Sequence, residues 1–169
     1  RKKMKFDISS AKIIKKNSNI KLYSSDMKVE GDLGNSYISS LSIFSDDYKK
    51  INSNIEIKSY INTNYKFLNF LLSEFKINKN FPRNLEGEVS GFLKISNKTN
   101  QGSYRYFFEG SLDNFNNITA NNKNMPIVLS KFNGEVLLSN DLIKIEGNGA
   151  INGSQSGINI LVNKDSVLT

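Results

Sequence analysis

Residues 143–162 read IKIEGNGAINGSQSGINILV, and this stretch decides the fold class. Ile143 and Ile145 alternate with polar neighbours, and Ile158 and Ile160 repeat the alternation after a segment rich in Asn, Gly and Ser. Successive side chains of a β-strand point to opposite faces, so each apolar pair lines one face of its strand. The stretch therefore predicts two strands joined by a short turn, each with one dry face and one wet face.

The same alternation recurs along most of the chain. Its apolar positions are Phe6, Ile8, Ile20, Leu22, Leu41, Ile43, Ile55, Ile57, Val89, Leu93, Ile95, Tyr104, Tyr106, Phe108, Leu112, Phe132, Val136, Leu138, Ile151 and Val162. An antiparallel sheet with one solvated face produces this pattern, whereas a buried parallel sheet produces continuous apolar runs. Turn-forming residues at 97–102, 121–126, 139–141 and 152–157 favour hairpin or meander connections. The chain is therefore predicted to be mainly β, with a curved antiparallel sheet that forms an open β-groove or a partly closed sandwich.

One segment breaks the alternation and predicts a short amphipathic helix near 63–75. Its apolar residues are spaced i, i+3, i+4 and i+7 at Leu68, Leu71, Leu72 and Phe75. Thr63 or Asn64 could cap its start, and residues 78–84 would end it. Two interpretations stay open: a helix that plugs a sheet end or covers an edge, and a helix that lies on a membrane surface. The shortage of Lys and Arg near it favours the first.

The domain organisation follows from these patterns. We expect an N-terminal β segment over 1–62, the helix and its connection over 63–80, and an antiparallel β segment over 81–169 that continues the same sheet. The chain begins with Arg1 instead of Met, and its last stretch stops within a strand pattern. We therefore expect it to be part of a longer protein.

The amino-acid composition excludes several kinds of catalytic and metal site. The 169 residues include no Cys and no His, which removes thiolate nucleophiles, the commonest general base and the commonest transition-metal ligands. The Asp46–Asp47 pair has no surrounding loop of EF-hand spacing, which favours a solvated turn over a metal site. Glutamates that recur beside glycine fall on the wet face of their strands, which argues against a carboxylate pair in a cleft. The sequence therefore predicts a protein that is not an enzyme and has no catalytic residue, metal or cofactor.

The positive charge is concentrated at the N-terminus. The chain has a formal net charge of +7, and residues 1–21 hold eight basic residues and one acidic residue, so the remainder is neutral. A nucleic-acid-binding protein should carry a basic stripe across its folded face, so we expect no nucleic-acid partner. The N-terminal charge is interpreted either as a solvated strand face or as attraction to anionic lipid headgroups.

Glycines recur on the predicted dry face. Seven share the alternation phase of their apolar neighbours: Gly31, Gly87, Gly91, Gly110, Gly134, Gly147 and Gly149. A strand bends where side chains are missing on its concave side, so these glycines predict curvature toward the dry face. They also predict shallow spaces that a flexible apolar ligand could fill. The alternative is an ordinary β-sandwich or barrel whose dry face meets a second sheet.

Four glycine-containing segments resemble the bacterial AsmA-like family of envelope proteins. They are LEGEVSGFLKI at 85–95, YFFEGSL at 106–112, FNGEV at 132–136 and IKIEGNGAING at 143–153. In that family, helices like the one expected at 63–75 also precede strands with a G-x-V-x-G pattern. The similarity covers about residues 60–162.

The resemblance implies a segment of a periplasmic protein similar to the bridge-like lipid-transfer proteins, anchored in the inner membrane at full length. Its apolar β-groove would bind or conduct phospholipid between the inner and outer membranes during envelope biogenesis. The implied partners are phospholipid, the membranes at the ends of the full-length protein, and other envelope proteins. The alternative is a non-catalytic β-sandwich scaffold, or an adhesion or protein-interaction domain.

The residues expected to line the groove are the dry-face residues of the second half of the chain. They are Val89, Leu93, Ile95, Tyr106, Phe108, Leu112, Phe132, Val136, Leu138, Ile145, Ile151, Ile158 and Ile160. The expected groove glycines are Gly87, Gly91, Gly110, Gly134, Gly147 and Gly149.

Overall fold

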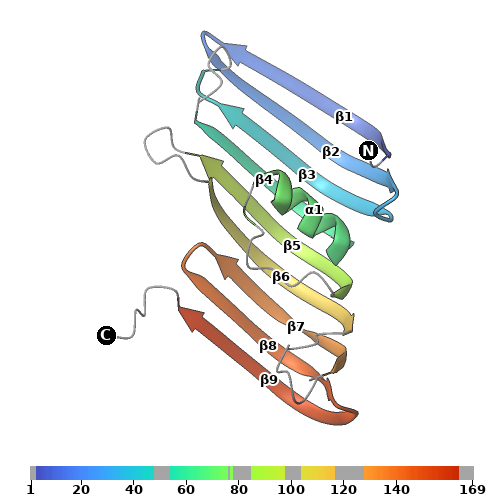
Figure 1. Cartoon of the computed structure of the whole chain (residues 1–169). Helices are drawn as coiled ribbons and strands as arrows, with labels where there is room; N and C mark the ends of the chain where they lie inside the picture. Colours follow the sequence, from blue (N-terminus) through green and yellow to red (C-terminus); the bar gives the residue numbers. More distant parts are fainter. Residues whose placement is uncertain are drawn as a thin grey trace.

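The computed structural model describes residues 3–47, 54–75, 77, 85–97, 104–116 and 128–163. In this part of the chain one antiparallel sheet holds nine strands in sequence order, and one short helix follows the fourth strand (Figure 1). The elements are β1 Met4–Lys16, β2 Asn19–Gly31, β3 Ser36–Ser45, β4 Ile55–Asn64, α1 Tyr65–Glu74, β5 Glu86–Asn97, β6 Tyr104–Asn116, β7 Leu129–Ser139, β8 Leu142–Ile151 and β9 Ser154–Asn163. The prediction of a curved antiparallel sheet with one short helix is confirmed.

A two-residue turn joins β8 to β9. Asn152 and Gly153 form the connection from β8 to β9, with φ angles of 50° and 85°. Asn and Gly tolerate positive φ better than other residues, which suits them to a two-residue hairpin turn. This turn is shorter than the predicted 152–157, because residues 154–157 already pair with β8. The predicted turns at 97–102 and 121–126 lie almost entirely outside the described residues.

Irregularities in the pairing change which side chains face the core. The registers of β5–β6, β6–β7 and β7–β8 each shift once. Asn114 and Lys131, which lie at two of these shifts, have positive φ angles of 53° and 51°. An extra residue in one strand bends it and reverses the phase of the alternation. As a result Phe115 is buried beyond Asn114, although strict alternation from Leu112 would place it on the solvated face.

Helix α1 begins where β4 ends. The Asn64 side chain caps it, because its Oδ1 accepts a hydrogen bond from the Phe67 backbone N–H at 2.9 Å. Asn64 is therefore the cap, while the Thr63 hydroxyl lies 2.5 Å from that of Ser36. The helix lies within the predicted range, and residues 78–84, expected to end it, lie outside the described residues.

The helix packs on the middle of the sheet. It contacts β4 and β5, and Figure 1 shows it lying across the sheet over these two strands. The prediction that it plugs an end or covers an edge is wrong, because the chain turns back onto the sheet immediately after β4. Phe67, Leu68 and Leu72 are buried against the protein, so they are not exposed to a membrane surface. No helix among the described residues has the length and apolar character that a membrane crossing requires.

The sheet is continuous on both sides of the helix. β4 pairs with β5 over ten positions, from Ile55 with Asn97 to Asn64 with Glu88. The strands before α1 and the strands after it therefore belong to one sheet. We call the sheet face on which α1 packs the inner face, and the opposite face the outer face.

Candidate functional site

The inner face is buried at its centre and exposed at its edges. Val89 on β5 is 0% exposed and Phe108 on β6 is 2% exposed. At the two edge strands, Phe6 on β1 is 53% exposed and Ile160 on β9 is 42% exposed. In the described residues all strands belong to one sheet, so no second sheet covers this face. The inner face is thus covered by α1 at its centre and open to solvent toward β1 and β9.

An apolar hollow of about 240 Å³ lies on the inner face between α1 and the strands β5 to β9. Its lining residues are Tyr65, Leu68, Leu85, Val89, Tyr106, Phe108, Leu112, Phe115, Leu129, Phe132, Val136, Leu138, Ile143, Ile145, Ile158 and Ile160. Fourteen of these sixteen are aliphatic or phenylalanine, and the other two are tyrosines. The lining therefore contains no Asp, Glu, Lys or Arg.

The two tyrosines remain uncharged at neutral pH. Burial raises the pKa of the Tyr65 hydroxyl well above its ordinary value of 10. Burial also raises the pKa of Tyr106, and the nearby Asp141 carboxylate adds to the effect. The Tyr65 ring meets the Phe115 ring edge-on, with centroids 5.6 Å apart. The lining therefore combines two neutral tyrosines with hydrocarbon side chains.

Ten of the thirteen residues expected to line a groove line this hollow. They are Val89, Tyr106, Phe108, Leu112, Phe132, Val136, Leu138, Ile145, Ile158 and Ile160. Leu93 and Ile95 do not line the hollow; they are 3% and 2% exposed within the core cluster that includes α1. Ile151 lies at the end of β8, where it pairs with Leu129, and it is half-buried outside the hollow.

Six lining residues were not expected as groove residues: Tyr65, Leu68, Leu85, Phe115, Leu129 and Ile143. Two of them could have been predicted from the sequence. Leu68 belongs to the apolar stripe of the helix, and Ile143 shares the alternation of Ile145. The sequence pattern does not place Phe115 and Leu129 on the inner face, because bulges reverse the alternation beside each of them.

The glycines of the inner face do not leave the empty spaces that the sequence predicts. A Cβ added at Gly134 would lie 2.7 Å from the ring of Phe132, and one added at Gly147 would lie 2.8 Å from the same ring. Phe132 also lies against Gly149, and the Phe115 ring lies against Gly87 in the same way. The Phe132 and Phe115 rings therefore lie against these positions, as is common beside glycines in sheets, and at Gly134 and Gly147 backbone atoms of the paired strand lie closer still.

At Gly91 and Gly110 the backbone itself fills the space. These two glycines pair across β5 and β6, and a Cβ on Gly91 would lie 2.6 Å from the Gly110 Cα. Such a separation is too short for any side chain, so the two strands approach here only because both residues are glycine. The predicted curvature toward the inner face thus has a local cause in this pair.

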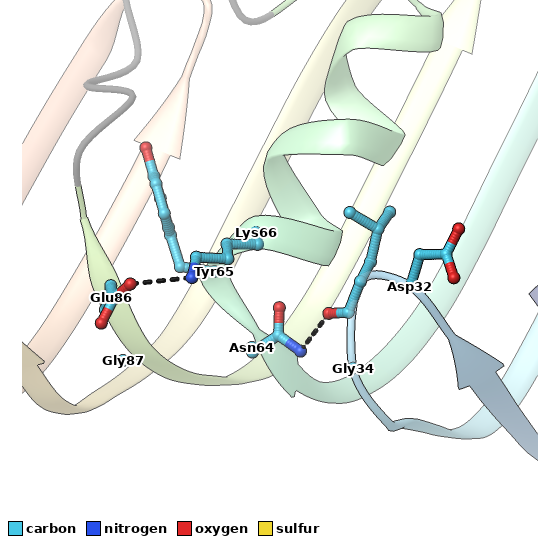
Figure 2. Close-up of a pocket in the computed structure, with 8 residues that line it drawn as sticks. Asp32, Gly34, Asn64, Tyr65, Lys66, Glu86 and Gly87 are labelled. Atoms are coloured by element: carbon cyan, nitrogen blue, oxygen red, sulfur yellow. Dashed lines mark hydrogen bonds and ion pairs between the residues drawn. The ribbon is translucent and has the colours of Figure 1, made fainter. Parts of the chain in front are cut away.

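A second pocket, of about 340 Å³, lies at the start of α1 (Figure 2). The Asn64 side chain, labelled in Figure 2, donates a hydrogen bond of 2.6 Å from its Nδ2 to the Leu33 carbonyl. It also shows Lys66 reaching Glu86, with Nζ 2.7 Å from Oε1. The ammonium group lowers the pKa of the Glu86 carboxyl. These contacts tie the helix start to β5 and to the β2–β3 connection, which is a structural role.

The outer face carries the charged residues that strand alternation placed there. Glu30, Glu86, Glu109 and Glu146 are all exposed. Asp46 accepts hydrogen bonds from the backbone and side chain of Asn54, with the backbone contact at 2.9 Å. Among the described residues no group of His, Cys, Asp and Glu is arranged to hold a metal ion.

An ion-pair network crosses β4 and β5 on the outer face. The Glu56 carboxylate lies 2.7 Å from Lys58 and 3.0 Å from Lys94. Hydrogen bonds from the two ammonium groups lower the pKa of Glu56 below its ordinary value. All three side chains are at least one-third exposed, so solvent screening keeps the contribution of this network to stability small.

Comparisons with protein-family models, curated proteins and solved structures find no significant match for this chain. Functional inference therefore depends on the residues and their arrangement. Within that arrangement, the candidate site is the uncharged apolar hollow on the inner face.

Proposed function

We propose that the inner face binds the acyl chains of phospholipid, and that the chain is a segment of a periplasmic AsmA-like protein that conducts phospholipid between the inner and outer membranes. The observation that carries this proposal is the apolar hollow, in which sixteen side chains from one helix, five strands and Leu85 just before β5 converge without a charged group. The periplasmic compartment, the membrane anchor of the longer protein and the conduction of lipid between the two membranes are what the sequence resemblance implies.

The energetics of lipid movement favour such a surface. Burial of a methylene group is worth about 0.8 kcal/mol, so an acyl chain of about 15 methylenes loses roughly 12 kcal/mol if it enters water. A continuous apolar surface removes most of that barrier while the headgroup stays in water. The hollow, at about 240 Å³, is smaller than the roughly 300–1,000 Å³ of a pocket that encloses a drug-sized ligand. It therefore suits part of an acyl chain and not a whole lipid.

The lining also suits a ligand that has to move. Directional hydrogen bonds or ion pairs would hold a ligand at one position, and specificity in pockets comes from such polar groups. Here the only lining residues with a polar side-chain group are Tyr65 and Tyr106, both neutral at physiological pH. At β9 the lining continues into Ile160, which is 42% exposed, and Val162 beyond it is 45% exposed. An acyl chain could therefore leave the hollow along apolar side chains.

Ile145→Asp is expected to reduce copurified phospholipid at least about tenfold, because a carboxylate in the hollow must be desolvated before an acyl chain can bind. Ile145 is half-buried and lines the hollow, so the variant is expected to stay folded. The measurement is native mass spectrometry of protein purified from bacteria, with circular dichroism to verify the fold. Asn148→Asp is the matched control, since it adds the same charge at an exposed outer-face position of the same strand.

Two outcomes would overturn the proposal. The first is recovery of the wild-type chain without bound phospholipid. The second is equal lipid content in the Ile145→Asp and Asn148→Asp proteins while both remain folded, because bound lipid would then not occupy the hollow.

A further inference from the structure

The strand register gathers basic residues at one end of the outer face. Two neighbouring rows of cross-strand partners run there from β1 to β6. The first row is Ile14, Lys21, Phe44, Glu56, Ser96 and Arg105. The second row is Lys12, Tyr23, Ser42, Lys58, Lys94 and Phe107. These rows hold five basic residues and one acidic residue, and we call them the basic patch.

The basic patch combines residues that are far apart in the sequence. Lys12 and Lys21 belong to the basic N-terminal segment, whereas Lys58, Lys94 and Arg105 belong to the remainder of the chain, whose net charge is zero. All five side chains reach solvent. The excess positive charge of the N-terminus therefore extends across the outer face as far as β6.

The opposite end of the outer face has a different charge balance. There Lys5 lies opposite Glu30, and Lys28 lies opposite Asp7, so each cation faces an anion on the neighbouring strand. On β6 to β8 a hollow of about 300 Å³ is lined by Lys144 and by three glutamates, Glu109, Glu135 and Glu146. Excess positive charge is thus a property of one end of this face.

Apolar side chains lie among the cations of the basic patch. Ile14 and Tyr23 are 42% and 40% exposed, and the Lys21 Nζ lies 5.5 Å from the centre of the Phe44 ring. Surfaces that bind membranes combine basic groups, which attract anionic headgroups, with apolar and aromatic side chains that enter the interface. Tyrosine suits such a surface because its ring is apolar and its hydroxyl is polar.

The aromatic rings beside the patch favour a lipid surface over a nucleic acid. The ring planes of Tyr60 and Phe92 meet at 49°, and those of Phe92 and Phe107 meet at 57°. Phe92 and Phe107 are also half-buried. Binding of a single-stranded nucleic acid uses exposed ring faces on which successive bases stack. Tilted and half-buried rings do not form such a platform.

We propose that the basic patch docks on an anionic phospholipid surface, with Ile14 and Tyr23 entering the headgroup layer. Strands lie about 4.8 Å apart, so five spacings from β1 to β6 extend the patch over roughly 24 Å, which allows contact with several headgroups at once. The patch lies on a face of the sheet, so strands added beyond β1 or β9 would leave it uncovered.

The cations of the patch contribute unequally to this attraction. The Glu56 carboxylate lies 2.7 Å from Lys58 and 3.0 Å from Lys94, which offsets part of their charge. We therefore expect Lys12 and Lys21 to attract headgroups more strongly than Lys58 and Lys94. This inference does not rest on the proposed function, because the patch and the hollow lie on opposite faces.

Cosedimentation with lipid vesicles tests the proposal on the chain of 169 residues. The wild-type chain is expected to bind phosphatidylcholine vesicles that contain about one-third phosphatidylglycerol, and not vesicles of phosphatidylcholine alone. Added salt should release it, because salt screens exposed charges. The double variant Lys12→Gln with Lys21→Gln is expected to bind at least about tenfold more weakly. Both side chains are exposed, so circular dichroism should show an unchanged fold.

The matched control makes the same change of charge at the other end of the same two strands. Lys5→Gln with Lys28→Gln is expected to bind within about twofold of the wild-type chain, because these lysines already face acidic partners. A chain with a net charge of +7 is attracted to anionic vesicles wherever its charges lie. Both double variants lower that charge equally, so the difference between them reports the position of the charges.

Three results would overturn the proposal. One is the absence of binding that depends on phosphatidylglycerol, and another is an equal loss of binding in the two double variants. The third is tighter binding of a single-stranded oligonucleotide than of the anionic vesicles, which would assign the patch to nucleic acid. Ile145→Asp, which adds charge to the hollow, is expected to bind vesicles like the wild-type chain. Docking by the patch and acyl-chain binding in the hollow are therefore tested separately.

Discussion

Gly91→Ala is expected to lower the free energy of unfolding by about 3 kcal/mol, near the upper end for overpacking, because the new methyl group meets backbone and not a movable side chain. The added Cβ would lie 2.6 Å from the Gly110 Cα and closer still to the Glu109 carbonyl oxygen. Relief would require β5 and β6 to separate at the Gly91–Gly110 pair.

Urea unfolding followed by circular dichroism measures this effect. Gly157→Ala is the matched control, because a Cβ at this β9 position would meet only the Asn148 side chain, at an ordinary distance of 3.7 Å. The control is expected to unfold within about 0.5 kcal/mol of the wild-type protein, as is usual for surface substitutions. If the two alanine variants are equally stable, the close approach of Gly91 and Gly110 is not a determinant of the fold.

Phe132→Ala is expected to cost about 3–5 kcal/mol of unfolding free energy, the range for deleting a fully buried aromatic ring. Phe132 is 2% exposed, and its ring lies against Gly134 and Gly147, which have no side chains to move into the space that the ring would leave. The cavity should therefore persist beside the apolar hollow. Thermal and urea unfolding would both report the loss.

The control for this change is Phe6→Ala on the edge strand β1, where the ring is 53% exposed. We expect a change below about 1 kcal/mol there, because little of that ring is removed from water. A Phe132→Ala protein as stable as the Phe6→Ala protein would mean that the ring does not support the glycine-rich part of β7 and β8.

The sequence was most informative where local rules decide the structure. Alternation at Ile145 and Ile160 placed both on the inner face, since the side-chain period of a strand is fixed by its backbone. The sequence predicts Asn64 as one of two candidate helix caps, because its side chain can accept a hydrogen bond from a free backbone N–H of the first turn, and Asn64 is the cap. The turn at Asn152 and Gly153 follows from their tolerance of positive φ, although its length was overestimated.

The features that escaped prediction depend on contacts between distant segments. Phe115 and Leu129 line the hollow because bulges at Asn114 and Lys131 reverse the alternation beside them. A lysine in the sequence does not predict a positive φ. The sequence indicates a position without a side chain at Gly134, but it does not predict that the Phe132 ring lies against this position. The position of α1 over β4 and β5 likewise depends on contacts between the helix and the sheet, which the local sequence pattern does not specify.

The most direct measurement of the central claim is photo-crosslinking of bound lipid inside bacteria. A photoreactive amino acid replaces Ile145, which lines the hollow, or Asn148, which lies exposed on the outer face of the same strand. After irradiation and purification, mass spectrometry identifies covalent adducts. An apolar inner face that carries lipid predicts phospholipid adducts at position 145 and none at position 148. Adducts at neither position, or equally at both, would contradict it.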